Sequence, residues 1–113
     1  MKNSNKILYS VSGNIAKLTI NRPERRNALD AESLEQINIL MDEAESDEKV
    51  RVILITGQGD TFSSGFDLKD QMEKVPKGKQ WKPILELDHR TIMRFWNSPK
   101  PTIAAVRGAC LAG

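Results

Sequence analysis

The chain has 113 residues, of which 39% are hydrophobic and 28% are charged, and its formal net charge at pH 7 is +2. This length corresponds to one domain or to a piece of one. The scattered, nearly balanced charges argue against a nucleic-acid partner, and no apolar run has the length of a transmembrane helix. The single Cys110 excludes an intramolecular disulfide and a CxxC metal site. The first residues contain no signal-peptide core, so we expect a cytoplasmic protein.

Two short strands joined by a turn are predicted first, in the stretch "KILYSVSGNIAKLTI". β-branched residues are frequent there, and apolar residues stand among polar neighbours. Ser12, Gly13 and Asn14 supply the turn. Pro23 should end the pairing, because proline has no amide hydrogen to donate to a neighbouring strand.

A helix, a buried strand and a glycine-rich loop are predicted next. Asp30 is a suitable N-cap, and apolar residues at helical spacing indicate a helix from Ala31 to about Glu45. Residues 50 to 56, "VRVILIT", form a predicted strand whose continuously apolar centre suggests burial on both faces. The loop from Gly57 to Asp67 follows. Residues 69 to 82 are polar and are predicted as a surface segment with a helical turn at its start.

A second helix and a second buried strand are predicted in the last third of the chain. Apolar residues from Ile84 to Trp96 recur at helical spacing, and the proline at position 99 should end this helix. Trp96 is therefore expected in the core. Residues 101 to 106, "PTIAAV", are predicted as a buried strand, and Cys110 in the turn after it as a small buried side chain.

Glycine-containing loops follow both predicted buried strands, at residues 57 to 68 and 107 to 113. Neighbouring parallel strands deliver such loops to one sheet edge, where α/β proteins commonly bind ligands. Two N–H groups converging from separate loops make an oxyanion hole. We expect Gly65 to turn the chain so that the Phe66 N–H points outward, with Asp67 starting a helix behind it. The residues alone leave open that both loops are only turns, and that Asp67 is only an N-cap.

Other kinds of site have less support. Ser63 and Ser64 lack a His/Asp arrangement, so a serine nucleophile is not expected. The chain contains neither a GxGxxG nor a GxxxxGK[ST] pattern, which argues against dinucleotide and phosphate loops. No metal-binding constellation is present. His89, the only histidine, is predicted to be a surface or packing residue, and Trp81 to cover a loop.

Three stretches, "NRPERRNALD" (21 to 30), "VRVILITGQGDTFSSGFDL" (50 to 68) and "PTIAAVRGACLAG" (101 to 113), resemble the N-terminal signatures of the crotonase, or enoyl-CoA hydratase/isomerase, superfamily. Their order and spacing match, and the resemblance covers essentially the whole chain. It implies an α/β fold, a spiral of ββα repeats, of which residues 1 to 113 form the N-terminal part of an acyl-CoA-binding domain. It also implies homotrimers or hexamers.

The resemblance assigns roles to particular residues. The thioester carbonyl would lie between the N–H groups of Phe66 and Gly113, and Arg26, Ala28 and Leu29 would flank the bound coenzyme A. The other implied substrate-binding residues are Ser64, Gly65, Asp67, Leu68 and Lys69. Coenzyme A is then part of the substrate, and no separate cofactor is expected.

The implied reaction is hydration of a 2-enoyl-CoA through a stabilised thioester enolate. Isomerisation, dehalogenation and decarboxylation remain alternatives, because the superfamily's acid and base residues lie beyond the position of Gly113. A non-catalytic fragment that serves in interaction or assembly is the alternative from another class. Two residues depart from the pattern: Phe66 stands where many members have alanine, and Ala112 interrupts the family's glycine run.

Overall fold

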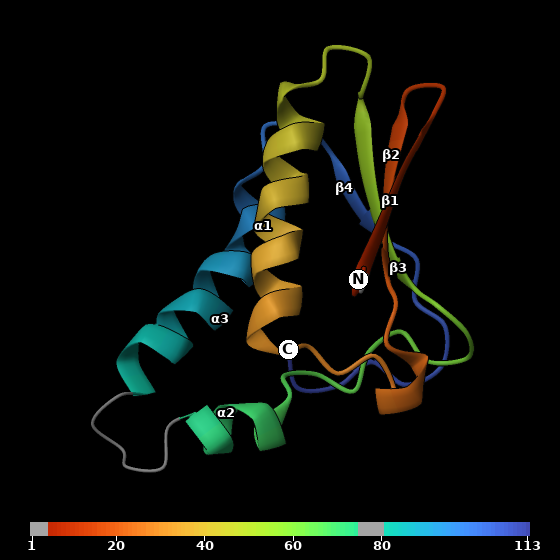
Figure 1. The fold of residues 1–113 in the computed structure, drawn as a ribbon. Helices are drawn as coiled ribbons and strands as arrows, with labels where there is room; N and C mark the ends of the chain where they lie inside the picture. The colour runs from red at the N-terminus through yellow and green to blue at the C-terminus, as the bar shows by residue number, and fades with distance from the viewer. Residues whose placement is uncertain (1–4, 75–80) are drawn as a thin grey trace.

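The computed structural model describes residues 5–74 and 81–113, and its strands form one four-stranded sheet in the order β1-β2-β3-β4 (Figure 1). The strands are β1 (Ile7–Ser12), β2 (Ile15–Ile20), β3 (Val52–Gly57) and β4 (Thr102–Ala104). β1 and β2 are antiparallel, whereas β3 is parallel to both β2 and β4. The helical elements are η1 (Pro23–Arg25), α1 (Ala31–Ser46), α2 (Leu68–Lys74) and α3 (Trp81–Asn97). The predicted α/β class is confirmed.

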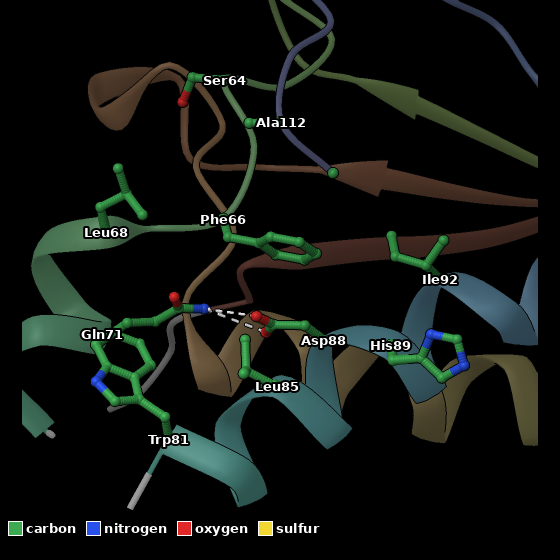
Figure 2. A pocket seen from close by; sticks show the side chains of 11 residues that line it. Ser64, Phe66, Leu68, Gln71, Trp81, Leu85, Asp88, His89, Ile92 and Ala112 are labelled. Atoms are coloured by element: carbon green, nitrogen blue, oxygen red, sulfur yellow. Dashed lines mark hydrogen bonds between the residues drawn. The ribbon is translucent and has the colours of Figure 1, made fainter. Parts of the chain in front are cut away.

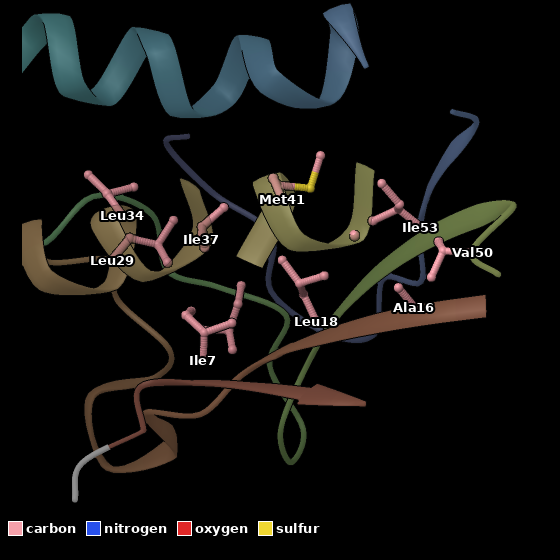
Figure 3. Packing of buried hydrophobic residues seen from close by; sticks show 11 residues of the cluster. Ile7, Ala16, Leu18, Leu29, Leu34, Ile37, Met41, Val50 and Ile53 are labelled. Atoms are coloured by element: carbon pink, nitrogen blue, oxygen red, sulfur yellow. The ribbon is translucent and has the colours of Figure 1, made fainter. Parts of the chain in front are cut away.

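The hairpin and the first helix follow the local signals in the sequence. The predicted turn joins β1 to β2, with Gly13 at φ 60°. At the start of α1, the Asp30 carboxylate accepts a hydrogen bond from the Ser33 N–H at 2.9 Å, which is the expected N-cap. The apolar face of α1 then packs on one face of the sheet (Figure 3). The buried core residues are Ile7, Ala16, Leu18, Ile20, Leu29, Leu34, Ile37, Met41, Ala44, Val50 and Ile53.

The prediction that both later strands are buried on both faces is wrong for the described residues. In β3, Ile53 is fully buried, but Leu54 and Ile55 are only partly buried. β4 is shorter than predicted and forms the sheet edge, where Ile103 is 51% exposed. Leu54 and Ile103 pair on the face of the sheet opposite to Ile53, which no described element covers, whereas α1 covers the other face. Ile55 lies on the same face as Ile53 but borders a cavity of about 280 Å³.

Two side chains that were predicted as buried are exposed. Trp96 is 82% exposed, although α3 begins and ends close to the predicted positions. Leu87 and Phe95 of α3 pack against the core, whereas Ile92 and Trp96 lie on a second apolar stripe that is exposed. Cys110 is also exposed, because the segment after β4 runs along the surface.

The region between the third strand and the last helix contains more helix than predicted. α2 has seven residues rather than a single turn, and Asp67 caps it by accepting from the Asp70 N–H at 3.0 Å. The N-cap reading of Asp67 is therefore confirmed. Part of the predicted polar surface segment, residues 75 to 80, lies outside the described residues.

Candidate functional site

The loops after β3 and β4 meet, as predicted from the parallel strands. The N–H groups of Phe62 and Ser63 both donate to the Ala109 carbonyl at 3.1 Å, and the Leu111 N–H donates to the Ser63 carbonyl at 3.1 Å. Ser63 and Cys110 form an isolated parallel bridge. These bonds extend the parallel pairing of β3 and β4 beyond the sheet and bring Phe66 close to the 111–113 segment.

Glycine is required where the two segments come closest. Gly65 has φ 99°, and a Cβ atom added there would lie 2.4 Å from the Ala112 carbonyl oxygen. Gly113 has φ 127°, and an added Cβ would lie 3.0 Å from the Phe66 ring. The unusual order of a glycine followed by a bulky Phe66 thus has a physical cause: Gly65 admits the neighbouring backbone, and Gly113 admits the ring.

The Phe66 amide differs from the expectation in one respect. Its N–H does not point into open space but donates to the Ala112 carbonyl at 3.1 Å. The absence of a side chain on Gly65 allows the Ala112 carbonyl to come this close. The Gly113 N–H, by contrast, has no acceptor among residues 5–74 and 81–113.

The "RNAL" segment supports the Phe66 loop through its backbone. The Leu29 N–H donates to the Gly65 carbonyl at 2.8 Å, and the Asp67 N–H donates to the Leu29 carbonyl at 2.8 Å. The Ser64 N–H donates to the Arg26 carbonyl at 3.0 Å. The Arg26 side chain is exposed, whereas the side chains of Ala28 and Leu29 are buried. Ala28 and Leu29 therefore offer a ligand little beyond their main chains.

Asn27, within the same segment, is a structural residue that the sequence analysis missed. It is fully buried at φ 57°. Its side-chain oxygen accepts from the Arg22 N–H at 2.8 Å, and its side-chain nitrogen donates to the carbonyls of Gln58 at 3.0 Å and Thr61 at 2.6 Å. Asn27 thus links the segment after β2 to the loop after β3. The sequence offered one hint of this role, because asparagine adopts a positive φ angle more readily than most residues.

Ser63 also has a structural role. Its hydroxyl donates to the Asn27 carbonyl at 2.8 Å and accepts from the Gly65 N–H at 2.9 Å. The side chain is buried. Both hydrogen-bonding functions of the hydroxyl are thus used to shape the loop, in agreement with the expectation that Ser63 is not a nucleophile.

Asp67 is part of a buried ion-pair network. Its Oδ2 atom lies 3.3 Å from Nη1 of Arg22 and 3.7 Å from Nη2 of Arg25. Arg22 Nη2 lies 3.6 Å from Oδ2 of Asp30, which is also bound by Lys6 Nζ at 2.6 Å. Arg22 Nη1 further donates to the Ala28 carbonyl. Arg22 was not predicted as a member of this network, because its partner Asp67 lies 45 residues further along the chain.

These contacts set the pKa values of the two aspartates. Burial alone would raise the pKa of Asp30, but hydrogen bonds from Lys6 and Ser33 and the charge of Arg22 lower it to about 2. Burial likewise would raise the pKa of Asp67, yet the Asp70 N–H, Arg22 and Arg25 hold it below the usual value. Both groups are therefore structural carboxylates.

A cavity of about 650 Å³ lies between the Phe66 loop, the 112–113 segment and helices α2 and α3 (Figure 2). It is lined by Ser64, Phe66, Leu68, Gln71, Trp81, Leu85, Asp88, His89, Ile92, Ala112 and Gly113. Of the predicted site residues, the structure thus brings together Ser64, Phe66, Leu68 and Gly113. The other predicted site residues, Arg26, Ala28, Leu29, Gly65, Asp67 and Lys69, do not line this cavity.

Asp67 and Lys69 instead line a smaller polar depression of about 250 Å³. Arg22, Arg25 and Asp30 also belong to its wall. This depression is lined almost entirely by charged side chains of both signs, in contrast to the mostly apolar main cavity.

α3 also lines the main cavity, which the sequence pattern did not predict. His89 is exposed, as predicted for a surface residue, but it also lines the cavity. Trp81, predicted to cover a loop, lies at the start of α3 and faces the cavity (Figure 2). The most buried polar groups in the wall are Gln71 and Asp88, whose side chains face each other. The sequence could have indicated a buried Asp88, because this residue stands among apolar residues on one face of the predicted helix.

Residues 5–74 and 81–113 contain neither a membrane-spanning helix nor a metal-binding cluster. No helix there is both long enough and apolar enough to cross a bilayer. No group of three His, Cys, Asp or Glu side chains in residues 5–74 and 81–113 is placed to hold a metal ion.

Comparison with known proteins identifies similar sequences and folds. The model of the family described as "Enoyl-CoA hydratase/isomerase" matches residues 10–113. A Bacillus subtilis protein named "Probable enoyl-CoA hydratase" is 38% identical over 110 residues, which cover 96% of this chain and 42% of the relative. The chain spans only 40% to 42% of the length of the first curated relatives that it matches.

Solved structures give the same result. A crystal structure of an enoyl-CoA hydratase/isomerase from Xanthobacter autotrophicus Py2 superposes with a TM-score of 0.93 at 56% identity. The match covers 97% of this chain and 41% of that one. A crystal structure described as a probable enoyl-CoA hydratase from Mycobacterium thermoresistibile matches with a TM-score of 0.79 at 36% identity, over 93% of this chain and 42% of that one. The described elements therefore form an N-terminal portion of the crotonase fold, as the resemblance implied.

Proposed function

Because the chain belongs to the enoyl-CoA hydratase/isomerase family, we propose that it forms part of an enzyme that processes acyl-CoA thioesters. The proposed reaction is hydration of a 2-enoyl-CoA, in which water adds across the double bond next to the thioester. The N–H groups of Phe66 and Gly113 stabilise the enolate oxygen that forms. Coenzyme A enters as part of the substrate, so the proposal includes no separate cofactor.

The observation that carries the proposal is the shared cavity of Phe66 and Gly113. These residues come from separate loops, yet both line the same mostly apolar space of about 650 Å³. An apolar cavity with a few convergent polar groups is the usual form of a small-molecule site. Removal of one oxyanion donor costs about 2.7–4 kcal/mol in comparable enzymes.

The Phe66 amide must exchange its partner in this mechanism. Its N–H now donates to the Ala112 carbonyl, and the thioester oxygen would replace that acceptor. Ala112 has φ 42°, a conformation that is uncommon for residues other than glycine. A shift of the 111–113 segment that frees the Phe66 N–H would also let Ala112 leave this conformation. We therefore propose that substrate binding moves this segment.

Coenzyme A is proposed to lie along the "RNAL" segment. The exposed Arg26 side chain is suited to a phosphate, because a guanidinium presents several donors in one plane. The main chain of Ala28 and Leu29, whose N–H and carbonyl groups are already hydrogen-bonded within the protein, would flank the pantetheine by contact alone, and the exposed Lys69 would lie near the nucleotide. The proton donor and acceptor for hydration are proposed to lie beyond Gly113. Assembly as trimers or hexamers and a cytoplasmic location also belong to this proposal.

The direct test is the response of two amides to a bound thioester. The protein is expressed from the complete open reading frame, labelled with ¹⁵N and titrated with hexanoyl-CoA. This ligand is a saturated thioester, which cannot be hydrated. The resonances of Phe66 and Gly113 should move together, and the thioester C=O stretch should shift to lower frequency. Binding without either change would refute the oxyanion assignment. No binding at all would favour the alternative of a non-catalytic fragment.

A further inference from the structure

A buried carboxyl group lies in the mostly apolar wall of the main cavity. Asp88 of α3 is only 6% exposed, and it lines the cavity together with Leu85, Ile92 and Phe66. A charged residue is rarely buried in such a place unless it is paired. Its partner therefore decides what the carboxyl group does.

The partner of Asp88 is a neutral amide. The Gln71 Nε2 atom lies 2.9 Å from Oδ2 and 3.2 Å from Oδ1 of Asp88. Gln71 is itself buried, at 7% exposure, and lines the same cavity. No lysine or arginine in residues 5–74 and 81–113 forms an ion pair with Asp88. Burial raises the pKa of Asp88, which the Gln71 hydrogen bond only partly opposes.

A comparison with Asp67 separates two uses of a buried aspartate. Asp67 lies near two arginines, caps a helix, and does not line the main cavity. Asp88 faces the cavity (Figure 2), and no cation among residues 5–74 and 81–113 forms an ion pair with it. An amide–carboxyl bond between α2 and α3 would join the helices no better than an apolar contact, because the desolvation of the carboxyl group opposes it. The contrast with Asp67 indicates that the Asp88 carboxyl group contacts a ligand rather than stabilises the fold.

The place of the pair in the cavity indicates which part of a ligand it would meet. The Phe66 ring points into the cavity, with Asp88 and Gln71 beside it toward the helices (Figure 2). If the thioester lies at the Phe66 and Gly113 amides, an acyl chain that passes the ring reaches Asp88 some carbons further on. Leu85 and Ile92 of α3, which also line the cavity, are apolar, and His89 is the other polar side chain that α3 contributes to the wall.

We propose that Asp88, positioned by Gln71, recognises a hydroxyl group on the acyl chain of the substrate, beyond the carbons next to the thioester. This inference rests on the proposed acyl-CoA function. A hydroxyl group suits the site in either protonation state, since it donates to a carboxylate and accepts from a carboxylic acid. The preferred substrate class is therefore a hydroxylated acyl-CoA rather than a purely aliphatic one.

The test compares ligands that differ only in the hydroxyl group. Dissociation constants are measured by calorimetry for hexanoyl-CoA and for hexanoyl-CoA with a hydroxyl at C4, C5 or C6. The protein is the longest product of the coding sequence. At least one hydroxylated ligand should bind about tenfold more tightly than hexanoyl-CoA, as expected when a buried polar group would otherwise be left unpaired. Asp88→Leu should abolish the preference, whereas the matched control Glu86→Leu, at an exposed carboxylate of α3 that does not line the cavity, should keep it.

Each outcome decides the matter. Equal binding of all four ligands, or a preference that survives in Asp88→Leu, would overturn the inference while the acyl-CoA function stands. If no ligand binds, both proposals are wrong. If Asp88→Leu does not fold, the wild-type protein still gives an answer: the Asp88 side-chain ¹³C resonance should move with the preferred hydroxylated ligand and not with hexanoyl-CoA. An unchanged resonance would overturn the inference.

Discussion

Arg22 Nη1 lies 3.3 Å from Asp67 Oδ2, and both side chains are buried. Arg22 stands just before η1, whereas Asp67 follows Phe66 directly and caps α2. The ion pair therefore holds the backbone on one side of the Phe66 amide, and the Leu29–Gly65 hydrogen bond holds the other. Neither Arg22 nor Asp67 lines the main cavity, so their effect on the site is one of position.

Replacing Arg22 should destabilise the fold strongly. Arg22→Met leaves the buried Asp67 without its closest cation, and loss of one partner of a buried pair costs about 3–5 kcal/mol. Arg25→Gln is the matched control: Arg25 lies 3.7 Å from the same oxygen but is 45% exposed, so about 1 kcal/mol or less is expected. Urea unfolding measures both free energies. Similar losses for the two variants would show that burial of the Arg22 pair is unimportant.

Acid should destabilise the protein through Asp30. Its pKa is lowered from 3.8 to about 2 in the folded state. A lowered folded-state pKa stabilises the fold above the unfolded-state value, and this stability is lost as pH falls from about 4 toward 2. Asp30→Asn should remove part of this acid-induced loss in the free energy of unfolding. Asp88→Asn is the control and should retain it, since burial shifts the Asp88 pKa in the opposite direction. The assignment fails if Asp30→Asn has the wild-type pH dependence.

Local signals predicted the local structure well. The Gly13 turn, the Asp30 cap of α1 and the meeting of the loops after β3 and β4 all depend on neighbouring residues or on parallel pairing. Burial was harder to predict, because it depends on what covers each face. Trp96 and Ile103 carry the apolar pattern of core residues but have no described element over them.

The polar network of the site was the least predictable part. Arg22 and Asp67 are 45 residues apart, and Gln71 and Asp88 are 17 apart. No periodic pattern links the members of such pairs. The Phe66–Ala112 bond was also missed, because a glycine at position 65 shows only that something comes close and does not say what.

Phe66→Pro should reduce turnover of 2-enoyl-CoA in the longest product of the coding sequence by about 10²–10³-fold. Proline removes the N–H that is proposed to bind the thioester oxygen. Phe66→Ala keeps that N–H and should retain most of the turnover. Because the same N–H now bonds to Ala112, circular dichroism must first show that the proline variant is folded. A folded Phe66→Pro enzyme with wild-type kcat would contradict the oxyanion role.

Arg26→Ala should raise KM for acyl-CoA and leave kcat nearly unchanged. The Arg26 side chain is exposed, and only its carbonyl, which accepts from Ser64, supports the loop. An effect on binding alone is the kinetic pattern of an interaction that is equal in the ground state and the transition state. Arg26→Lys keeps the charge and should have an intermediate KM. A large fall in kcat at saturating substrate would show that Arg26 acts on the chemical step instead.

The 113-residue chain by itself should show no hydratase activity and should self-associate. Hydration needs a proton donor and acceptor at the reacting carbons, which contribute about 10²–10⁴-fold, and these residues are proposed to lie beyond Gly113.

Association is expected from the exposed apolar side chains along α3, β4 and the segment that follows. Trp96 is 82% exposed, Leu111 59%, Val106 52% and Ile103 51%. Exposed apolar patches and an open strand edge favour contacts between copies. Sedimentation velocity over a range of concentrations should detect larger species, and the double variant Trp96→Lys/Leu111→Lys should reduce them.

Hydration of a short enoyl-CoA by a monomeric 113-residue chain would refute this placement of the acid and base. Asp88 and His89, the titratable side chains that residues 5–74 and 81–113 place in the wall of the main cavity, would then be the first candidates for those roles.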